Sequence, residues 1–254
     1  MSLIQDLLQV VPDGEVQEVH IGLHWTAVSV RVDGILRCGL ASTLHGLHQH
    51  SGPDVPQAGR LTELSARELA ALADLPDQPT QCSLGVAALN ALLAAGIQET
   101  PDLNAEEMIA RLGAGKRVAL VGHFPFVDHL RGRVGELAVL ELNPHPGDFP
   151  AESAPQVLAG AEVAAITGMT VQNHTLESLL SLTAPGAVIL VLGPSTPMHA
   201  RMFEHGIGVL SGSLVTDIES VMRLVAQGAN FRQIHRHGVS LVNMVHPDIA
   251  AKFN

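Results

Sequence analysis

The apolar positions of the first hundred residues pass from a helical spacing to an alternating spacing and back again. Within residues 26–32 valines alternate with polar residues, which predicts a half-buried strand. The dipeptide Asp33-Gly34 that follows is typical of a two-residue hairpin turn. We therefore expect a three-stranded antiparallel meander that packs on helices. The expected elements are a helix over 2–11, strands over 15–21, 26–32 and 35–40, and helices over 61–75, 83–95 and 101–112.

From residue 116 onward, short continuous apolar runs alternate with helical or loop segments. Residues 118–122 read as a fully buried strand after the helix-stop signals Gly113 and Gly115. This rhythm is typical of a parallel sheet with crossover helices. The expected strands cover 118–122, 137–142, 162–167, 187–192, 207–210 and an edge strand over 239–245, with helices over 153–158, 175–181, 198–203 and 217–227.

Two domains of α/β class follow from this change of pattern. The boundary should lie between Gly96 and Lys116, which gives an α+β meander-plus-helices domain over 1–112 and a Rossmann-like doubly wound domain over 113–254. Ligands of such sheets bind beyond the carboxyl ends of the strands. We expect the strand order 3-2-1-4-5, in which the loop after Gly122 faces the loop after Gly193 across the switch point.

The loop after the strand at 118–122 departs from a dinucleotide-binding fingerprint. A pyrophosphate needs several glycines for close approach of the backbone, but only Gly122 is present, and Phe124 and Pro125 fill the space. Glu141 ends the next strand, where it would either hold a ribose or face water or an Arg. A nucleotide site is therefore disfavoured and remains an alternative.

Polar residues also follow the third and fourth strands of this sheet. Thr167-Gly168 ends the third strand, and Asn173 is placed to cap a helix that begins near Thr175. The fourth strand ends in Gly193-Pro194-Ser195-Thr196, whose hydroxyl groups would either bind a ligand or cap the next helix. Both loops are candidate walls of one binding site.

Composition excludes some classes of partner. The net charge is −11 and aromatic residues make up 3% of the chain, so neither clustered cations nor base-stacking side chains point to nucleic acid. No apolar run approaches the roughly 18 residues of a membrane span. Cys38 and Cys82 form no CxxC pair, so we expect a reduced, cytoplasmic protein. The low charged content of 15% fits a homodimer interface.

Histidine is unusually frequent, with 14 residues. His45, His48 and His50 cluster in one loop, and they would either ligate a transition metal ion or remain solvated. Other polar residues fall near the expected crevice but cannot be told from surface residues by sequence; they are His123, His129, His145, Asp128 and Asp148.

Several of these motifs, in their order and spacing, resemble the heavy-metal chelation domain family. The motifs are residues 121–125, Glu141, 166–168 with 173–177, and 192–197, together with 21–26 and 85–91 of the first domain. The resemblance implies an enolase-N-terminal-like first domain, a Rossmann-like second domain and a site in the crevice between them. It also implies a transition metal ion or a metal chelate as ligand. The residues that it assigns to the site are Gly122, Phe124, Pro125, Glu141, Thr167, Gly168, Asn173, Thr175, Gly193, Pro194, Ser195, Thr196 and Asn90. His123 lies inside the first motif but departs from the residue type common there, and it is a further candidate for the site.

Three hypotheses remain open at this stage. The first is a protein that binds a metal complex or another small molecule between its domains, with or without catalysis. The second is a nucleotide- or cofactor-dependent enzyme that uses the Rossmann-like domain and Glu141. The third is an oligomeric scaffold without catalytic activity.

Overall fold

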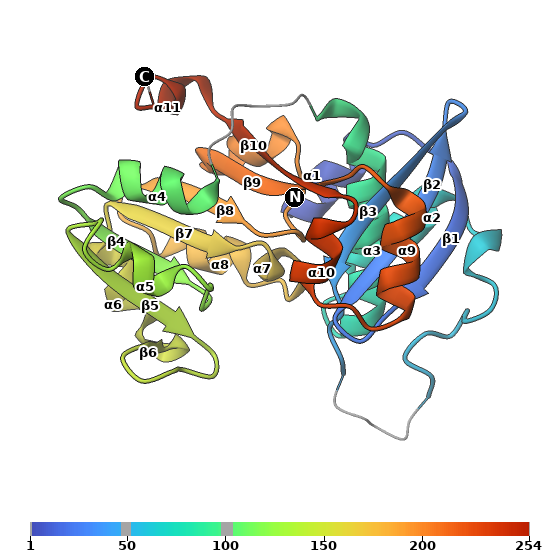
Figure 1. Ribbon diagram of the computed structural model, residues 1–254, viewed down its shortest axis with the longest axis horizontal. Helices are drawn as coiled ribbons and strands as arrows, with labels where there is room; N and C mark the ends of the chain where they lie inside the picture. Colours follow the sequence, from blue (N-terminus) through green and yellow to red (C-terminus); the bar gives the residue numbers. More distant parts are fainter. Residues whose placement is uncertain (1, 47–51, 98–103, 254) are drawn as a thin grey trace.

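A computed structural model describes residues 2–46, 52–97 and 104–253, and the strands of these residues form two sheets (Figure 1). The N-terminal sheet is the predicted antiparallel meander, in the order β1-β2-β3. Its hairpin turns at Asp33 and Gly34, which adopt φ values of 50° and 78°. The strands are β1 (Glu15–Ile21), β2 (Trp25–Val32) and β3 (Ile35–Ser42).

Helices cover both faces of this meander, so the expectation of a half-buried second strand is wrong. The helix α3 (Pro79–Leu93) packs on one face, and α9 (Ile218–Ala226), from the far end of the chain, packs on the other. Ser29 of β2 is consequently buried. The approach of α3 is very close at Gly39, where a Cβ atom would lie 2.2 Å from the carbonyl oxygen of Ala87.

The second sheet is parallel except for its last strand, β10, which runs antiparallel to β9. Its order is β10-β9-β8-β7-β4-β5-β6. The expected pairing of the first and fourth strands is therefore wrong, because β7 lies between β4 and β8. The strands are β4 (Arg117–Val121), β5 (Glu136–Glu141), β6 (Phe149–Pro150), β7 (Val163–Thr167), β8 (Val188–Leu192), β9 (Val209–Val215) and β10 (Val239–Val245).

This order moves the topological switch point to the gap between β4 and β7. The chain proceeds from β4 to β5 on one side and then returns to place β7 on the other side of β4. Where the connections from two neighbouring strands run to opposite sides of the sheet, a crevice opens above the carboxyl ends of those strands. The structure therefore predicts a binding site beside β7 rather than beside β8.

Helices pack on both faces of the second sheet. On one face α4 and α5 join β4 and β8 in a core that includes Met108 and Leu120, and on the other α6 packs on Ala119 and Ala164. These helices are α4 (Ala105–Gly113), α5 (Val127–Leu130) and α6 (Ala154–Gly160). The remaining helices are α1 (Leu3–Val10), α2 (Ala66–Ala71), α7 (Met169–Gln172), α8 (Leu176–Ser181), α10 (Phe231–Arg236) and α11 (Pro247–Ala250).

The segment after β8 differs from its prediction. Instead of an α-helix over 198–203, a 3-10 helix spans Ala200–His205, and His199 rather than Ser195 or Thr196 caps it through a hydrogen bond from the Arg201 N–H (3.1 Å). Pro197 therefore lies outside this helix.

The two halves of the chain (residues 2–97 and 104–253) share one hydrophobic core. Side chains of α1, α2 and α3 pack with Ile166 of β7 and Leu210 of β9, and α9 and α10 lie over the N-terminal sheet (Figure 1). The domain boundary near residues 96–116 stays a prediction. Cys38 and Cys82 are buried in these cores, and burial raises the pKa of each thiol to about 12. None of the helices in the described ranges is long and apolar enough to span a membrane.

Candidate functional site

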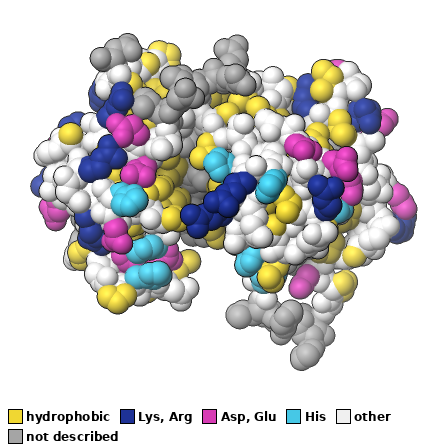
Figure 2. Space-filling model, in the orientation of Figure 1, with side chains coloured by type: hydrophobic (Ala, Val, Ile, Leu, Met, Phe, Trp, Pro, Cys, Tyr) yellow, Lys and Arg dark blue, Asp and Glu magenta, His cyan; other side chains and the backbone are white. Residues whose placement is uncertain are grey.

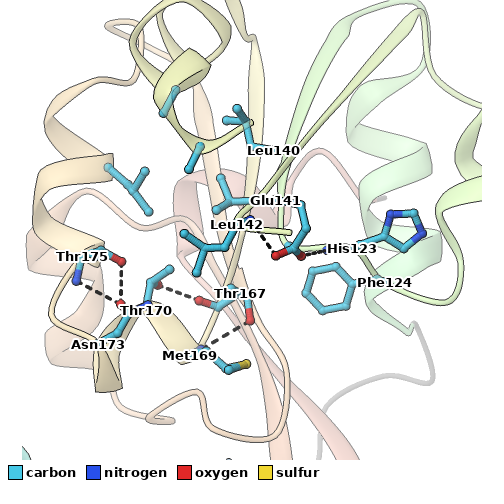
Figure 3. A pocket seen from close by; sticks show the side chains of 15 residues that line it. His123, Phe124, Leu140, Glu141, Leu142, Thr167, Met169, Thr170, Asn173 and Thr175 are labelled. Atoms are coloured by element: carbon cyan, nitrogen blue, oxygen red, sulfur yellow. Dashed lines mark hydrogen bonds between the residues drawn. The ribbon is translucent and has the colours of Figure 1, made fainter. Parts of the chain in front are cut away.

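A pocket of about 330 Å³ opens at the switch point, above the carboxyl ends of β4, β5 and β7 (Figure 3). Most of its lining is apolar, and seven of the residues predicted for the site contribute to it. All lining residues lie within 121–179, inside the expected second domain, so this cavity is not an interdomain crevice, and a site between the domains stays a prediction. The lining residues are Val121, Gly122, His123, Phe124, Leu140, Glu141, Leu142, Ala151, Ala154, Thr167, Met169, Thr170, Asn173, Thr175 and Leu179.

The carboxylate of Glu141 fixes the loop that forms one wall of this pocket. Its Oε2 accepts a hydrogen bond from the His123 N–H (2.8 Å), and its Oε1 accepts one from the Leu142 N–H (2.7 Å). Gly122 begins the loop with φ of 103°, a conformation that favours glycine. Glu141 thus holds the backbone of its own strand end and of the neighbouring loop.

The imidazole of His123 points away from the cavity (Figure 3). Its Nδ1 lies 2.7 Å from Oδ2 of Asp148, and its ring stacks on that of His145 with a centroid distance of 4.2 Å. His123 therefore edges the pocket with its backbone while its side chain belongs to a second group of residues on the rim.

A tight turn between β5 and β6 positions the other two members of this group. Oδ2 of Asp148 accepts a hydrogen bond from the His145 N–H (3.1 Å), and Gly147 between them has φ of 94°. The Asp148 side chain is fully buried, while that of His123 is 28% exposed. Burial acts to raise the pKa of the Asp148 carboxyl, but the hydrogen bonds from His123 and from the His145 N–H outweigh it and hold that pKa below its ordinary value.

The wall beside α7 and α8 combines the apolar side chains of Met169 and Leu179 with two hydrogen-bonded pairs of polar residues (Figure 3). Thr170 donates its hydroxyl proton to the Thr167 carbonyl (2.6 Å). Oδ1 of Asn173 accepts from both the N–H and the hydroxyl of Thr175, at 3.2 and 2.6 Å. Asn173 thus orders the start of α8, close to its predicted capping role, although Thr175 is the cap residue.

A second, more open cavity of about 440 Å³ lies on the α4 and α5 side of the same loop. Pro125, Gly193 and Pro194 line it, and Phe124 lines both cavities. The loops after β4 and β8 therefore border a common cavity although their strands are not neighbours.

The remaining predicted residues form a buried contact between the halves. Asn90 donates from Nδ2 to the Leu40 carbonyl (2.9 Å) and to the Ser195 carbonyl (3.4 Å). Ser195 Oγ accepts from the Ser42 N–H (2.9 Å). Gly168 and Thr196 pack against each other in the same region. These residues join β3 and α3 to the second sheet and do not line the 330 Å³ pocket.

The predicted histidine cluster is only partly described. Nε2 of His45 lies 3.4 Å from the Leu23 carbonyl, and His48 and His50 lie outside the described residues. In the described part of the chain, one group of His, Cys, Asp or Glu side chains is close enough to hold a metal ion; it consists of His123, His145 and Asp148. The sequence identified these three only as separate polar residues. The one local signal was His145-Pro146-Gly147-Asp148, a turn that brings its first and last residues together.

The fold and the pocket together define a mixed α/β protein with a Rossmann-like sheet and a cavity at its switch point. The profile of the DUF364 family, described as "Putative heavy-metal chelation", matches residues 104–244, and that of DUF4213, with the same description, matches 4–93. The chain belongs to this heavy-metal chelation family, as its motifs indicated.

Two solved structures share this fold over nearly their whole length. A DUF364-family protein of unknown function from Desulfitobacterium hafniense DCB-2 is 25% identical, with a TM-score of 0.80 over 96% of this chain and 98% of that one. A second, from Pyrococcus horikoshii, is 21% identical, with a TM-score of 0.82 and the same coverage. No curated protein matches the chain.

Proposed function

We propose that this protein binds a metal chelate, a small and largely apolar organic molecule that carries a transition metal ion, in the pocket at the switch point. The observation that carries the proposal is the pocket lining, in which apolar side chains predominate and no Lys or Arg occurs among the described residues. Ligand pockets of this size bind through apolar burial and use a few polar groups for orientation.

The charges around the pocket favour a neutral or cationic ligand. Glu141 is the one carboxylate in the lining as far as the structure describes the chain, and its oxygens already accept backbone hydrogen bonds. An anionic ligand would meet this carboxylate in a site of low polarity without a compensating cation, at a high desolvation cost.

The family description adds the metal, since both matched profiles concern heavy-metal chelation. The alternative of a nucleotide-dependent enzyme receives less support. A diphosphate needs basic side chains or several free backbone N–H groups. Among the described residues no Lys or Arg lines the pocket, Phe124 is part of its lining, and the His123 N–H already donates to Glu141.

Thermal unfolding of tag-free protein tests the proposal. Suitable probes are the phenanthroline complexes of Ni²⁺, Cu²⁺ and Zn²⁺, compared with free phenanthroline, the free ions, NAD and ATP. A ligand at 100 times its Kd adds about 2.7 kcal/mol of stability, which corresponds to about 5–10 °C in Tm for a chain of this size. We expect such a shift with at least one complex and none with NAD or ATP.

A filled pocket provides the matched control. Ala151→Phe places a ring in the cavity, whereas Ala71→Phe adds the same ring to an exposed position of α2. We expect Ala151→Phe to abolish the shift and Ala71→Phe to retain it. An unchanged shift in Ala151→Phe, no shift with any complex, or an equal shift with free phenanthroline would contradict the proposal.

The cytoplasmic location and the homodimer expected from the sequence remain predictions. Light scattering of the tag-free protein tests the second, and a monomer would refute it.

A further inference from the structure

We infer that His123, His145 and Asp148 form a binding site for a divalent first-row transition metal ion on the rim of the pocket. One ligand atom from each residue lies within 4.8 Å of the others. The inference deepens the proposed function, because it places a metal site beside the ligand pocket, but it rests on a separate group of atoms.

The donor set suits Zn²⁺, Co²⁺, Ni²⁺, Cu²⁺ or Fe²⁺. Two imidazoles and one carboxylate occur together at open zinc and iron sites, whereas Mg²⁺ and Ca²⁺ prefer sites made of oxygen atoms. Bonds of about 2.0–2.1 Å to a tetrahedral ion put ligand atoms about 3.4 Å apart. Since the ligand atoms lie within 4.8 Å of one another, the three groups have to contract by at most about 1.4 Å. His145 is exposed, so its ring is free to make this adjustment.

The Asp148 carboxylate supplies an independent indication that a cation belongs here. Its side chain is fully buried, and Oδ1 has no hydrogen-bond partner among the described residues. A buried carboxylate oxygen without a partner is costly, and a bound cation removes that cost. The hydrogen bonds to Oδ2 from His123 and from the His145 N–H already orient the group before an ion arrives.

The turn that carries two of the ligands is built to hold this arrangement. The Asp148 N–H donates to the His145 carbonyl (2.9 Å) while the His145 N–H donates to the Asp148 side chain, so the two residues are linked in both directions. The third ligand follows Gly122, whose loop Glu141 fixes to the neighbouring strand. Preorganised ligands lose little conformational entropy when the ion binds.

Three protein ligands leave a coordination position open. An open position is the mark of metal sites that exchange or bind a further ligand, whereas structural zinc sites are closed by four residues. The His123 imidazole points away from the cavity (Figure 3), and His145 is exposed at the β5–β6 end of the molecule, where histidine and acidic side chains gather on the surface (Figure 2). Water is therefore the candidate for that position.

Calorimetry with Zn²⁺ and Ni²⁺ and visible absorption with Co²⁺, on tag-free protein stripped with a chelator, test this site. We expect one ion per chain, and a loss of affinity of about 10- to 100-fold or more in both His145→Ala and Asp148→Asn. The control His237→Ala removes an exposed histidine at the end of α10 and should bind like the parent. Because Asp148→Asn also alters the turn, His145→Ala keeps the test valid if the Asn variant fails to fold.

A variant with alanine at His45, His48 and His50 separates the two metal hypotheses. Retention of one-to-one binding in this triple variant supports the rim site. Loss of binding there, together with parent-like affinity in His145→Ala, would overturn it, as would no binding of any of the three ions. Neither His145 nor Asp148 lines the pocket, so failure of this site is distinguishable from failure of the pocket proposal tested with Ala151→Phe.

Discussion

The packing of Gly168 against Thr196, next to the contact that Ser195 makes with Ser42 and Asn90, offers a quantitative test of the fold. Gly168 follows β7 with φ of −60° and ψ of −15°, a conformation that alanine adopts without strain. A Cβ atom at this position would lie 2.5 Å from Thr196 Oγ1, 2.8 Å from its backbone nitrogen and 3.0 Å from its Cα. The hydroxyl can rotate away, but the backbone atoms require the whole loop after β8 to move.

We expect Gly168→Ala to destabilise the fold through this overlap. Normal contact begins near 3.4 Å, so the loop has to retreat by about half an ångström. Overpacking of this kind costs about 1–3 kcal/mol. The same loop carries Ser195, whose backbone carbonyl and side chain bind Asn90 and Ser42, so the displacement weakens the contact between the halves.

The reference for this measurement is Gly160→Ala at the end of α6, where a Cβ atom would meet nothing within 4 Å. That variant isolates the gain of about 0.4–1 kcal/mol that alanine brings by restricting the unfolded chain. Urea unfolding, followed by fluorescence of Trp25 and by circular dichroism, gives both free energies. Gly168→Ala should unfold at a lower urea concentration than Gly160→Ala, and its free energy of unfolding should be lower by about 1–3 kcal/mol. Metal binding should be intact in both variants. Equal stability of the two variants would refute the close packing.

Two further substitutions test the hydrogen bonds that Asn90 donates and the contribution of neutral His199 to stability. Asn90→Ala removes the donor that the carbonyls of Leu40 and Ser195 share. We expect the free energy of unfolding in urea to fall by about 1–3 kcal/mol and chelate binding to remain unchanged. Lost binding at unchanged stability would instead make Asn90 a ligand residue. Burial, followed by the charge of Arg201, lowers the pKa of His199 in the folded protein. As pH falls, His199 is therefore protonated in the unfolded chain before it is protonated in the folded one. The stability that neutral His199 contributes is lost as pH falls below about 6.5. His199→Asn keeps an acceptor for the Arg201 N–H and should lessen this loss between pH 7.5 and pH 5.5 in urea unfolding, whereas an identical loss in parent and variant would contradict it.

The sequence predicted most of the strands because buried strands carry their signal locally, although it missed β6 and ended β9 at residue 210 instead of Val215. Residues 118–122 and 187–192 are continuous apolar runs, and both form central strands with both faces covered. The hairpin at Asp33 was likewise predictable, because an Asp-Gly pair between two alternating segments favours one kind of turn.

The order of those strands was not predictable, because a crossover has the same local sequence pattern on either side of a strand. After β6 the chain crosses back over the sheet and places β7 next to β4, between β4 and β8. The loop after β4 therefore lies beside the loop after β7 rather than beside the loop after β8. For the same reason the burial of Ser29 could not be foreseen, since α9, which covers it, is almost 190 residues distant in the chain. To predict the group of His123, His145 and Asp148 on the rim, both the local turn and the order of the strands have to be known. The turn from His145 to Asp148 is local, but its proximity to His123 depends on the pairing of β4, β5 and β6.

Glu141 shows how this fold differs chemically from a dinucleotide-binding one. In dinucleotide-binding sheets the backbone N–H groups after the first strand bind the phosphates of the ligand. In this protein the His123 N–H at that position donates to Glu141, a carboxylate of the chain itself, and so does the Leu142 N–H. An internal anion thus occupies a donor that an external phosphate would need, and its negative charge opposes a second anion. The position of Glu141 therefore supports the proposal of an apolar, uncharged or cationic ligand in the switch-point pocket. The acidic residue that suggested a ribose site in the sequence therefore counts against a phosphate at this loop.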